Sequence, residues 1–175
     1  ASGPSTTSSN VTTAAAATAG ATRDLGDLGG GAIAGLVLDG GELYLGGSTR
    51  NAALAAGTPV TAHSGGVDGF ALRLSTDLSS TADDQLAYVG GAGDDTVTAM
   101  AATGGKVWLT GSAGEGLGGV AMGAKDGFVS QVDLTSGAVD WTERMGGKDG
   151  YATPTSIAVG ATGASALDKL GLPSG

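Results

Sequence analysis

The sequence has no cysteine and few basic residues, and each absence excludes a class of protein. Without cysteine there is no disulfide framework and no cysteine-ligated zinc. Only 8 Lys and Arg stand against 17 Asp and Glu, which gives a net charge of −9 and a pI near 4.2. The basic residues form no stripe, so we expect no nucleic-acid partner. No apolar run reaches the ~18 residues of a membrane-spanning helix, so we expect no membrane insertion.

Side chains suited to catalysis are also scarce. His63 is the only histidine and lies in a polar stretch, which favours an exposed loop residue. One histidine without cysteine cannot form a zinc site by itself, and no serine lies in a nucleophile-elbow motif. The pair Asp83 and Asp84 lies in another polar stretch, where we expect both side chains to be solvated. We therefore predict that the chain is not an enzyme and has no cofactor.

Glycine is abundant instead, at 35 of the 175 residues. Ordinary proteins contain about 7% glycine, and this chain has no Gly-X-Y period of the collagen type. Glycine at this density indicates many tight turns. Charged residues make up only 14% of the chain and apolar residues 41%, which is the reverse of a disordered chain. The composition therefore predicts a folded chain with many corners.

An internal repeat organises the chain from residue 25 onward. Segments 32–48 and 96–112 align without a gap at an offset of 64 residues. Each segment reads as a strand, a turn centred on Gly-Gly and a second strand that ends in Gly-Ser. This pattern is typical of a β-hairpin.

Two further strands complete each unit. Asp-Gly-Phe opens a third strand at Asp68 and again at Asp126, and apolar residues alternate after it. A fourth strand follows at 85–89 and at 139–145, and each one is followed by Gly-Gly. The sequence therefore predicts an all-β fold of antiparallel four-stranded units, with about two and a half repeats.

The ends of the chain differ from the repeats. Residues 1–24 are rich in Ser, Thr and Ala, and read either as a tail or linker or as an edge strand that needs a partner. Residues 155–159 read as the first strand of a third unit, and 164–170 as a short helix with Gly171 as its C-cap. The predicted parts are a tail (1–24), a first repeat (25–91), a second repeat (92–147), the start of a third (148–163) and a short helix with its tail (164–175).

Four short strands per unit with glycine at the corners are typical of propeller blades. The segments 90–95, 108–112 and 126–128 resemble the bacterial SBBP-type β-propeller repeat, with its Gly-Gly-x-Gly-Asp-Asp, Thr-Gly-Ser and Asp-Gly-Phe motifs. The first copy departs from this pattern, because 29–31 is Gly-Gly-Gly and lacks the paired Asp. The resemblance implies propeller-like blades in a secreted or surface protein. The tail at 167–173 is similar to that of flagellum-associated propeller-repeat proteins of alphaproteobacteria, which implies a flagellar location.

The acidic corner of the repeat has two interpretations. Asp94, Asp95 and Asp149 could accept hydrogen bonds from backbone N–H groups of the turn. They could instead be oxygen ligands of calcium. They lack the dense Asp-x-Asp-x-Asp-Gly spacing of calcium loops, which favours the first interpretation. The large residues of the repeat are expected to fill the space between blades: Tyr44, Phe70, Trp108, Phe128 and Trp141.

The number of repeats gives the functional expectation. A propeller uses ~4–8 blades, so two and a half need partners: copies of the chain or the rest of a larger propeller or filament protein. We expect a non-enzymatic structural or scaffolding module of an exported bacterial surface or appendage protein, extracellular and flagellum-associated. Two alternatives are a module that binds glycan or peptide with loops 49–66 and 113–125, and a fragment of a propeller enzyme.

Overall fold

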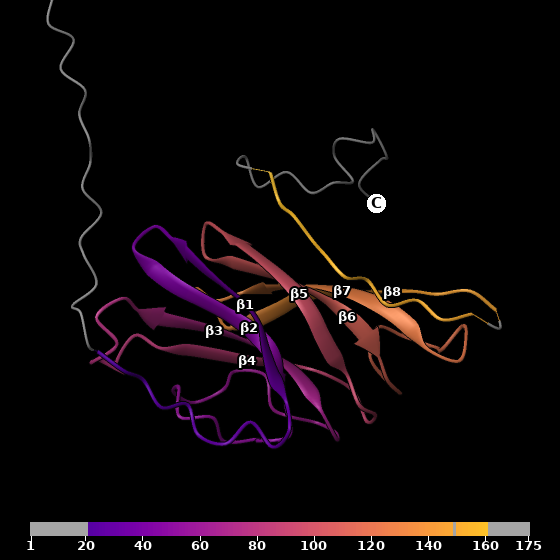
Figure 1. Cartoon of the computed structure of the whole chain (residues 1–175), viewed down its shortest axis with the longest axis horizontal. Coiled ribbons are helices and arrows are strands. Elements are labelled where there is room, and N and C mark those ends of the chain that lie inside the picture. The colour runs from indigo at the N-terminus through magenta and orange to yellow at the C-terminus, as the bar shows by residue number, and fades with distance from the viewer. Residues whose placement is uncertain (1–20, 149, 161–175) are drawn as a thin grey trace, which may run out of the picture.

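The computed structural model describes residues 21–148 and 150–160, which form two four-stranded antiparallel sheets (Figure 1). Each strand pairs with the next one along the chain, so the connections within each sheet join neighbouring strands. The prediction of an all-β fold built from four-stranded antiparallel units is confirmed. The first sheet contains β1 (Ala32–Asp39), β2 (Glu42–Thr49), β3 (Asp68–Ser75) and β4 (Gln85–Val89), and the second β5 (Thr96–Thr103), β6 (Lys106–Ala113), β7 (Asp126–Asp133) and β8 (Ala138–Met145).

The two sheets share their strand register. Val37 pairs with Tyr44 in the first hairpin, and Ala101 pairs with Trp108 in the second, at the predicted offset of 64 residues. Both hairpins also carry a register shift near the start of the first strand. The repeat in the sequence is therefore a repeat of backbone geometry.

The hairpin turns explain one set of paired glycines. Gly40 and Gly41 have φ values of 59° and 86°, and Gly104 and Gly105 have values of 59° and 82°. A type I′ turn requires positive φ at both central residues, which glycine adopts without strain. The Gly-Gly signal therefore identified both turns correctly.

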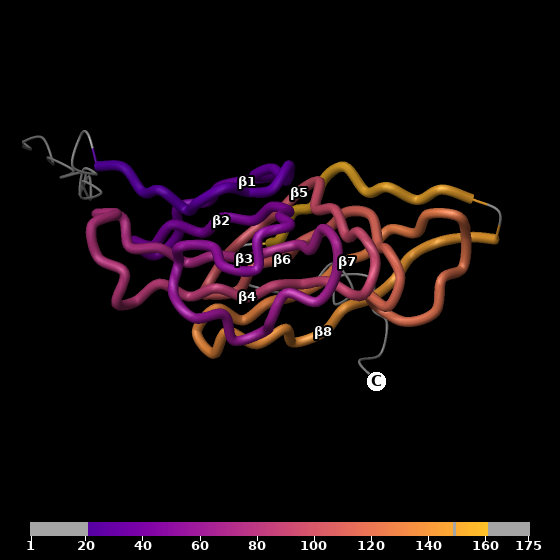
Figure 2. Tube along the Cα trace, turned by 90° about the horizontal axis from the view of Figure 1, so that it is seen from below, coloured from indigo at the N-terminus to yellow at the C-terminus, as the bar shows by residue number. Residues whose placement is uncertain are grey.

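One face of the first sheet packs on the second sheet, with β1 and β2 against β5 (Figures 1 and 2). We call the buried apolar cluster between the sheets the inter-sheet core. The first sheet contributes Tyr44, with Val37 partly buried against it, and the second contributes Val107, Leu109 and Phe128. The opposite face of the first sheet carries a second cluster, built on Phe70, Leu72, Leu86 and Tyr88.

Glycines let the two sheets approach closely. A Cβ atom at Gly35 would lie 2.5 Å from Cγ of Met100, and one at Gly46 would lie 2.7 Å from Cδ2 of Leu109. Both distances are too short for nonbonded carbon atoms. Side chains from the second sheet therefore fill space that the first sheet leaves by having glycine.

The start of the third unit differs from its prediction. Residues 152–160 form no strand, and the described ladder pairing with the second sheet is an isolated parallel bridge between Lys125 and Tyr151. Side-chain hydrogen bonds from Thr98 to Pro154 and between Ser112 and Thr153 also hold the segment on that sheet. A first strand needs a hydrogen-bonded second strand, which would come from residues beyond 160. Residues 1–20, 149 and 161–175, and with them the predicted helix at 164–170, lie outside the described residues.

The two sheets do not close into a ring, so a propeller stays a prediction. The division of the chain at residues 24, 91, 147 and 163 likewise stays a prediction. Within the described ranges, no helix is long and apolar enough to cross a membrane.

Candidate functional site

The Asp-Gly-Phe motif places a buried carboxylate at the start of each third strand. Asp68 and Asp126 are both buried. Asp68 Oδ2 accepts a hydrogen bond from Ser64 N at 2.6 Å, and Asp126 Oδ2 accepts one from Met122 N at 2.8 Å. Each carboxylate therefore pins the loop that precedes its own strand.

The same carboxylates explain the Gly-Gly corner that ends each unit. A Cβ atom at Gly90 would overlap the Asp68 carboxylate, and one at Gly146 would overlap the Asp126 carboxylate. Any other residue at Gly90 or Gly146 would have to displace a buried charged group. The pairing of Asp-Gly-Phe with a later Gly-Gly is therefore one structural unit.

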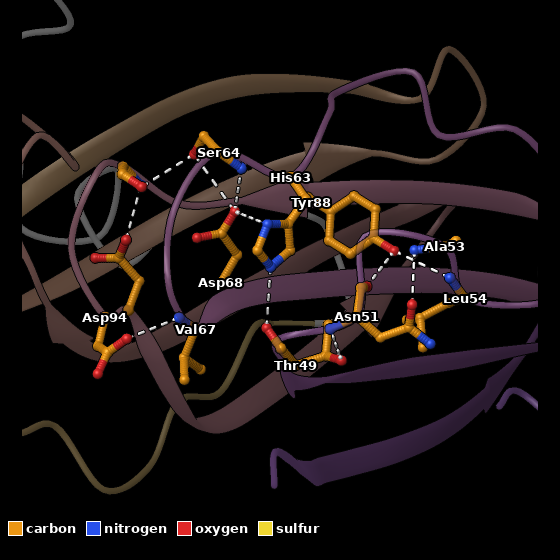
Figure 3. Close-up of polar contacts among 12 residues, drawn as sticks. Thr49, Asn51, Ala53, Leu54, His63, Ser64, Val67, Asp68, Tyr88 and Asp94 are labelled. Carbon is orange, nitrogen blue, oxygen red and sulfur yellow. Dashed lines mark hydrogen bonds and ion pairs between the residues drawn. The ribbon is translucent and has the colours of Figure 1, made fainter. Parts of the chain in front are cut away.

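In the first repeat, His63 and Tyr88 lie beside Asp68 (Figure 3). His63 Nδ1 is 3.6 Å from Asp68 Oδ2, and Nε2 is 3.2 Å from the carbonyl oxygen of Thr49. The His63 ring meets the Tyr88 ring edge to face at 5.3 Å. Only 8% of the His63 side chain is exposed, so the prediction of an exposed loop residue is wrong. The loop between β2 and β3, which carries His63, folds back over the sheet and buries the His63 side chain.

Tyr88 anchors that loop through its hydroxyl group. The hydroxyl donates to the carbonyl oxygen of Asn51 at 2.8 Å and accepts from Leu54 N at 3.2 Å. Burial raises the pKa of Tyr88. Asp68 Oδ1 has no hydrogen-bond partner among the described residues.

In the second repeat, an arginine takes the place of this arrangement. Strand register makes Arg144 the equivalent of Tyr88, because Arg144 pairs with Phe128 as Tyr88 pairs with Phe70. Arg144 Nε lies 3.1 Å from Asp126 Oδ2, and its Nη1 donates to a loop carbonyl at 2.8 Å. The ion pair is almost fully buried. The two repeats thus keep the carboxylate and change its partner.

The predicted acidic corner joins the two repeats. Asp95 is buried and accepts hydrogen bonds from Gly91 N at 2.7 Å and Gly114 N at 2.6 Å. Asp94 accepts one from Val67 N at 2.8 Å and lies 3.3 Å from Arg50 on the surface. Burial raises the pKa of Asp95, and the two N–H donors oppose this effect. These contacts are the ones expected if Asp94 and Asp95 accept hydrogen bonds from backbone N–H groups.

The calcium hypothesis stays a prediction. Asp149 lies outside the described residues. Among the residues that the structure does describe, no group of three or more His, Asp or Glu side chains could hold a metal ion.

A buried ion pair was missed in the sequence. Asp84 was expected to be solvated with Asp83, but it is buried and pairs with Arg23. Burial raises the pKa of Asp84, and the Arg23 guanidinium opposes this. The partners are 61 positions apart. No local pattern could have joined them.

The loop of the second repeat encloses an open hollow of about 650 Å³. Glu115, Lys125 and Arg144 are among its lining residues, and Val120 on its rim is 88% exposed. Both loops bury a leucine, Leu54 in the first repeat and Leu117 in the second.

The fold and these corners define an all-β protein of repeated four-stranded sheets with buried acidic corners. No family model matches the chain, so the resemblance to the SBBP-type repeat stays a prediction. The chain is 58% identical over 165 residues to the regulatory protein FlaEY of Caulobacter vibrioides. The match covers 94% of this chain, and the chain spans about 17% of that protein's length.

Proposed function

We propose that the chain is a non-enzymatic structural repeat module of an exported, flagellum-related bacterial protein. It acts by packing one four-stranded sheet on the next. The observation that carries the proposal is the inter-sheet core, in which Val107, Leu109 and Phe128 are fully buried against the first sheet. The buried carboxylates Asp95 and Asp126 accept backbone N–H groups, so they hold corners in place.

Two similarities support the flagellar part of the proposal. Nearly all of this chain, 94% of its residues, matches a part of the regulatory protein FlaEY. The tail at 167–173 resembles that of flagellum-associated repeat proteins. A structural module of an appendage would be extracellular, which agrees with an acidic chain that has little charge.

Replacing this segment in the source bacterium tests the proposal. We expect an in-frame deletion of the segment, and the core variant Leu109→Asp, to alter filament length in electron micrographs and to reduce swimming. The control Val120→Asp changes an 88% exposed residue and should swim like the parent strain. Normal filaments and normal swimming in the deletion strain would contradict the flagellar role.

Binding of glycan or peptide is a second candidate, favoured by the 650 Å³ hollow of the second repeat. Arg144 and Asp126 on its wall already engage each other, so a ligand would meet mainly loop backbone, Glu115 and Lys125. A glycan or peptide array hit that Ala121→Trp abolishes would favour this function. An array without hits would leave the structural role.

A further inference from the structure

An apolar surface lies on the face of the first sheet that is turned away from the second sheet. We call it the leucine face; it consists of Leu36 and Leu38 on β1, Leu43 and Leu45 on β2 and Leu74 on β3. Leu45 and Leu74 are already buried and Leu43 is half-buried, so the exposed part of the face lies on β1. Leu36 is 59% exposed and Leu38 is 58% exposed. A hollow of about 160 Å³ lies between four of these leucines and the incoming residues Arg23 and Leu25. β1 lies at the margin of the molecule (Figure 2).

The second sheet shows what this face does in the repeat. By strand register, the equivalents of the leucine face are Met100, Ala102, Val107, Leu109 and Val132. All five belong to the inter-sheet core or pack against it, and the last three are fully buried. The first sheet covers them. The leucine face is therefore the surface with which a repeat packs on the repeat before it.

Residues 21–25, which lead into the first sheet, lie beside the leucine face at the place where a preceding repeat would have its fourth strand. At the offset of 64 residues, 21–25 correspond to β4 at 85–89, and Leu25 corresponds to Val89. Leu25 packs in the cluster that contains Leu54, as Val89 packs in the core that contains Leu117. Arg23 fixes the segment by its ion pair with Asp84. This path leaves the β1 part of the face open.

We propose that the leucine face is the docking surface for a preceding four-stranded repeat of the same, longer polypeptide. The contact between the two sheets indicates which residues the preceding repeat must carry where it meets the leucine face. Gly35 and Gly46 make room for Met100 and Leu109. A repeat that covers Leu36 and Leu45 must likewise present glycine opposite them.

A second copy of this chain does not meet that requirement. The positions of its second sheet that correspond to Gly35 and Gly46 are Ala99 and Thr110. Because even a Cβ at Gly46 would lie 2.7 Å from Leu109, a threonine cannot take that place without shifting the sheets. The 58% identical relative is about six times as long as the matched segment, which leaves room for further repeats in that protein. The inference deepens the proposed function and rests on its packing of repeats, but it does not depend on a flagellar role.

Photocrosslinking in the full-length protein, produced in its own bacterium, tests the proposal. Benzoylphenylalanine replaces Leu36, and in the control it replaces Val120. We expect a crosslink within one molecule from position 36 to an earlier segment that carries glycine at the facing position, and none to that segment from position 120. A crosslink to a second copy, to another protein or to no protein would overturn the proposal.

A stability comparison gives a second, independent readout. Leu36→Lys in the 175-residue chain should leave Tm within about 1 °C of the parent, because the side chain is exposed there. The same change in the full-length protein should lower Tm by at least about 3 °C, because it places a charge in a buried face. Equal shifts in both proteins would overturn the proposal, as would a stable dimer of the 175-residue chain that Leu36→Lys dissociates. Filament assays do not enter either readout, so a failed flagellar role and a failed docking surface remain distinguishable.

Discussion

The two repeats have the same strand register, but their equivalent apolar faces are covered to different extents. The second sheet buries its inner apolar face under the first sheet, with Val107 and Leu109 fully covered. The equivalent face of the first sheet is covered only in part. The loop residue Leu54 and the incoming residue Leu25 pack in its apolar cluster. The difference is that the second repeat has a preceding sheet over this face, whereas Leu36 and Leu38 of the first repeat are exposed.

The buried corners give a second contrast. Asp68 and Asp126 occupy the same place at the start of the third strand. Both accept backbone N–H groups of the preceding loop, but the side chain that faces Asp126 is an arginine and the one that faces Asp68 is a histidine. What the two repeats retain is therefore the carboxylate, its glycine and the loop N–H donors, while the side-chain partner differs.

The largest expected effect on stability comes from removing Arg144 from its buried ion pair with Asp126. Arg144→Met leaves Asp126 without its counter-charge in a buried site, which should cost about 3–5 kcal/mol of unfolding free energy. The double variant Arg144→Met with Asp126→Asn should recover part of this loss in urea denaturation. A cost below about 1 kcal/mol for the single variant would show that the ion pair does not hold the corner.

The next effect compares equivalent leucines of the two sheets. Leu109→Ala removes a fully buried side chain from the inter-sheet core and should cost about 3–4 kcal/mol. Leu45→Ala in the 175-residue chain should cost about 1 kcal/mol less, because Leu45, although buried, borders a hollow of about 160 Å³. Equal costs in chemical denaturation would contradict the difference between the two faces.

A smaller effect concerns the loop of the first repeat. Tyr88→Phe removes the hydroxyl that binds Asn51 and Leu54, which should cost about 1–2 kcal/mol. Hydrogen exchange at the Leu54 amide should become faster in this variant. Arg144→Tyr, at the equivalent place, would lose the ion pair with Asp126 and the bond to the Gly119 carbonyl, so the tyrosine hydroxyl should not restore the stability of that corner.

The smallest expected effect is a pH dependence of stability at the end of β7, where Asp133 lies. Hydrogen bonds from Thr135 and the Lys106 ammonium lower the pKa of Asp133 to about 2. A carboxyl whose folded pKa is depressed adds stability above its unfolded pKa of about 4 and loses it as pH falls towards 2. Solvent screening keeps this below about 1 kcal/mol. The stability difference between the parent and Asp133→Asn should therefore shrink between pH 5 and 2, and a difference that stays constant would contradict the role of Asp133.

Much of the fold could be predicted from the sequence, because its signals are local. Gly40-Gly41 and Gly104-Gly105 require positive φ, and Asp-Gly-Phe opens β3 and β7 where it was expected. The alignment of the two copies then gave the four-stranded unit.

The candidate site could be predicted only in part, since its contacts are long-range. The corner contacts of Asp95 follow from turn chemistry, but the burial of His63 depends on how a long loop folds over β4. The pair of Arg23 and Asp84 has no local signal at all. The strand expected at 155–159 did not form among the described residues, because local propensity supplies no hydrogen-bonded partner.

Solvent accessibility of the leucine face tests the central claim most directly. Hydroxyl-radical footprinting with mass spectrometry can compare Leu36 and Leu38 in the 175-residue chain and in the full-length protein. The account predicts rapid oxidation of both residues in the chain and strong protection in the full-length protein, with Val120 oxidised equally in both. Equal oxidation of Leu36 and Leu38 in the two proteins would contradict the claim that each repeat packs on the one before it.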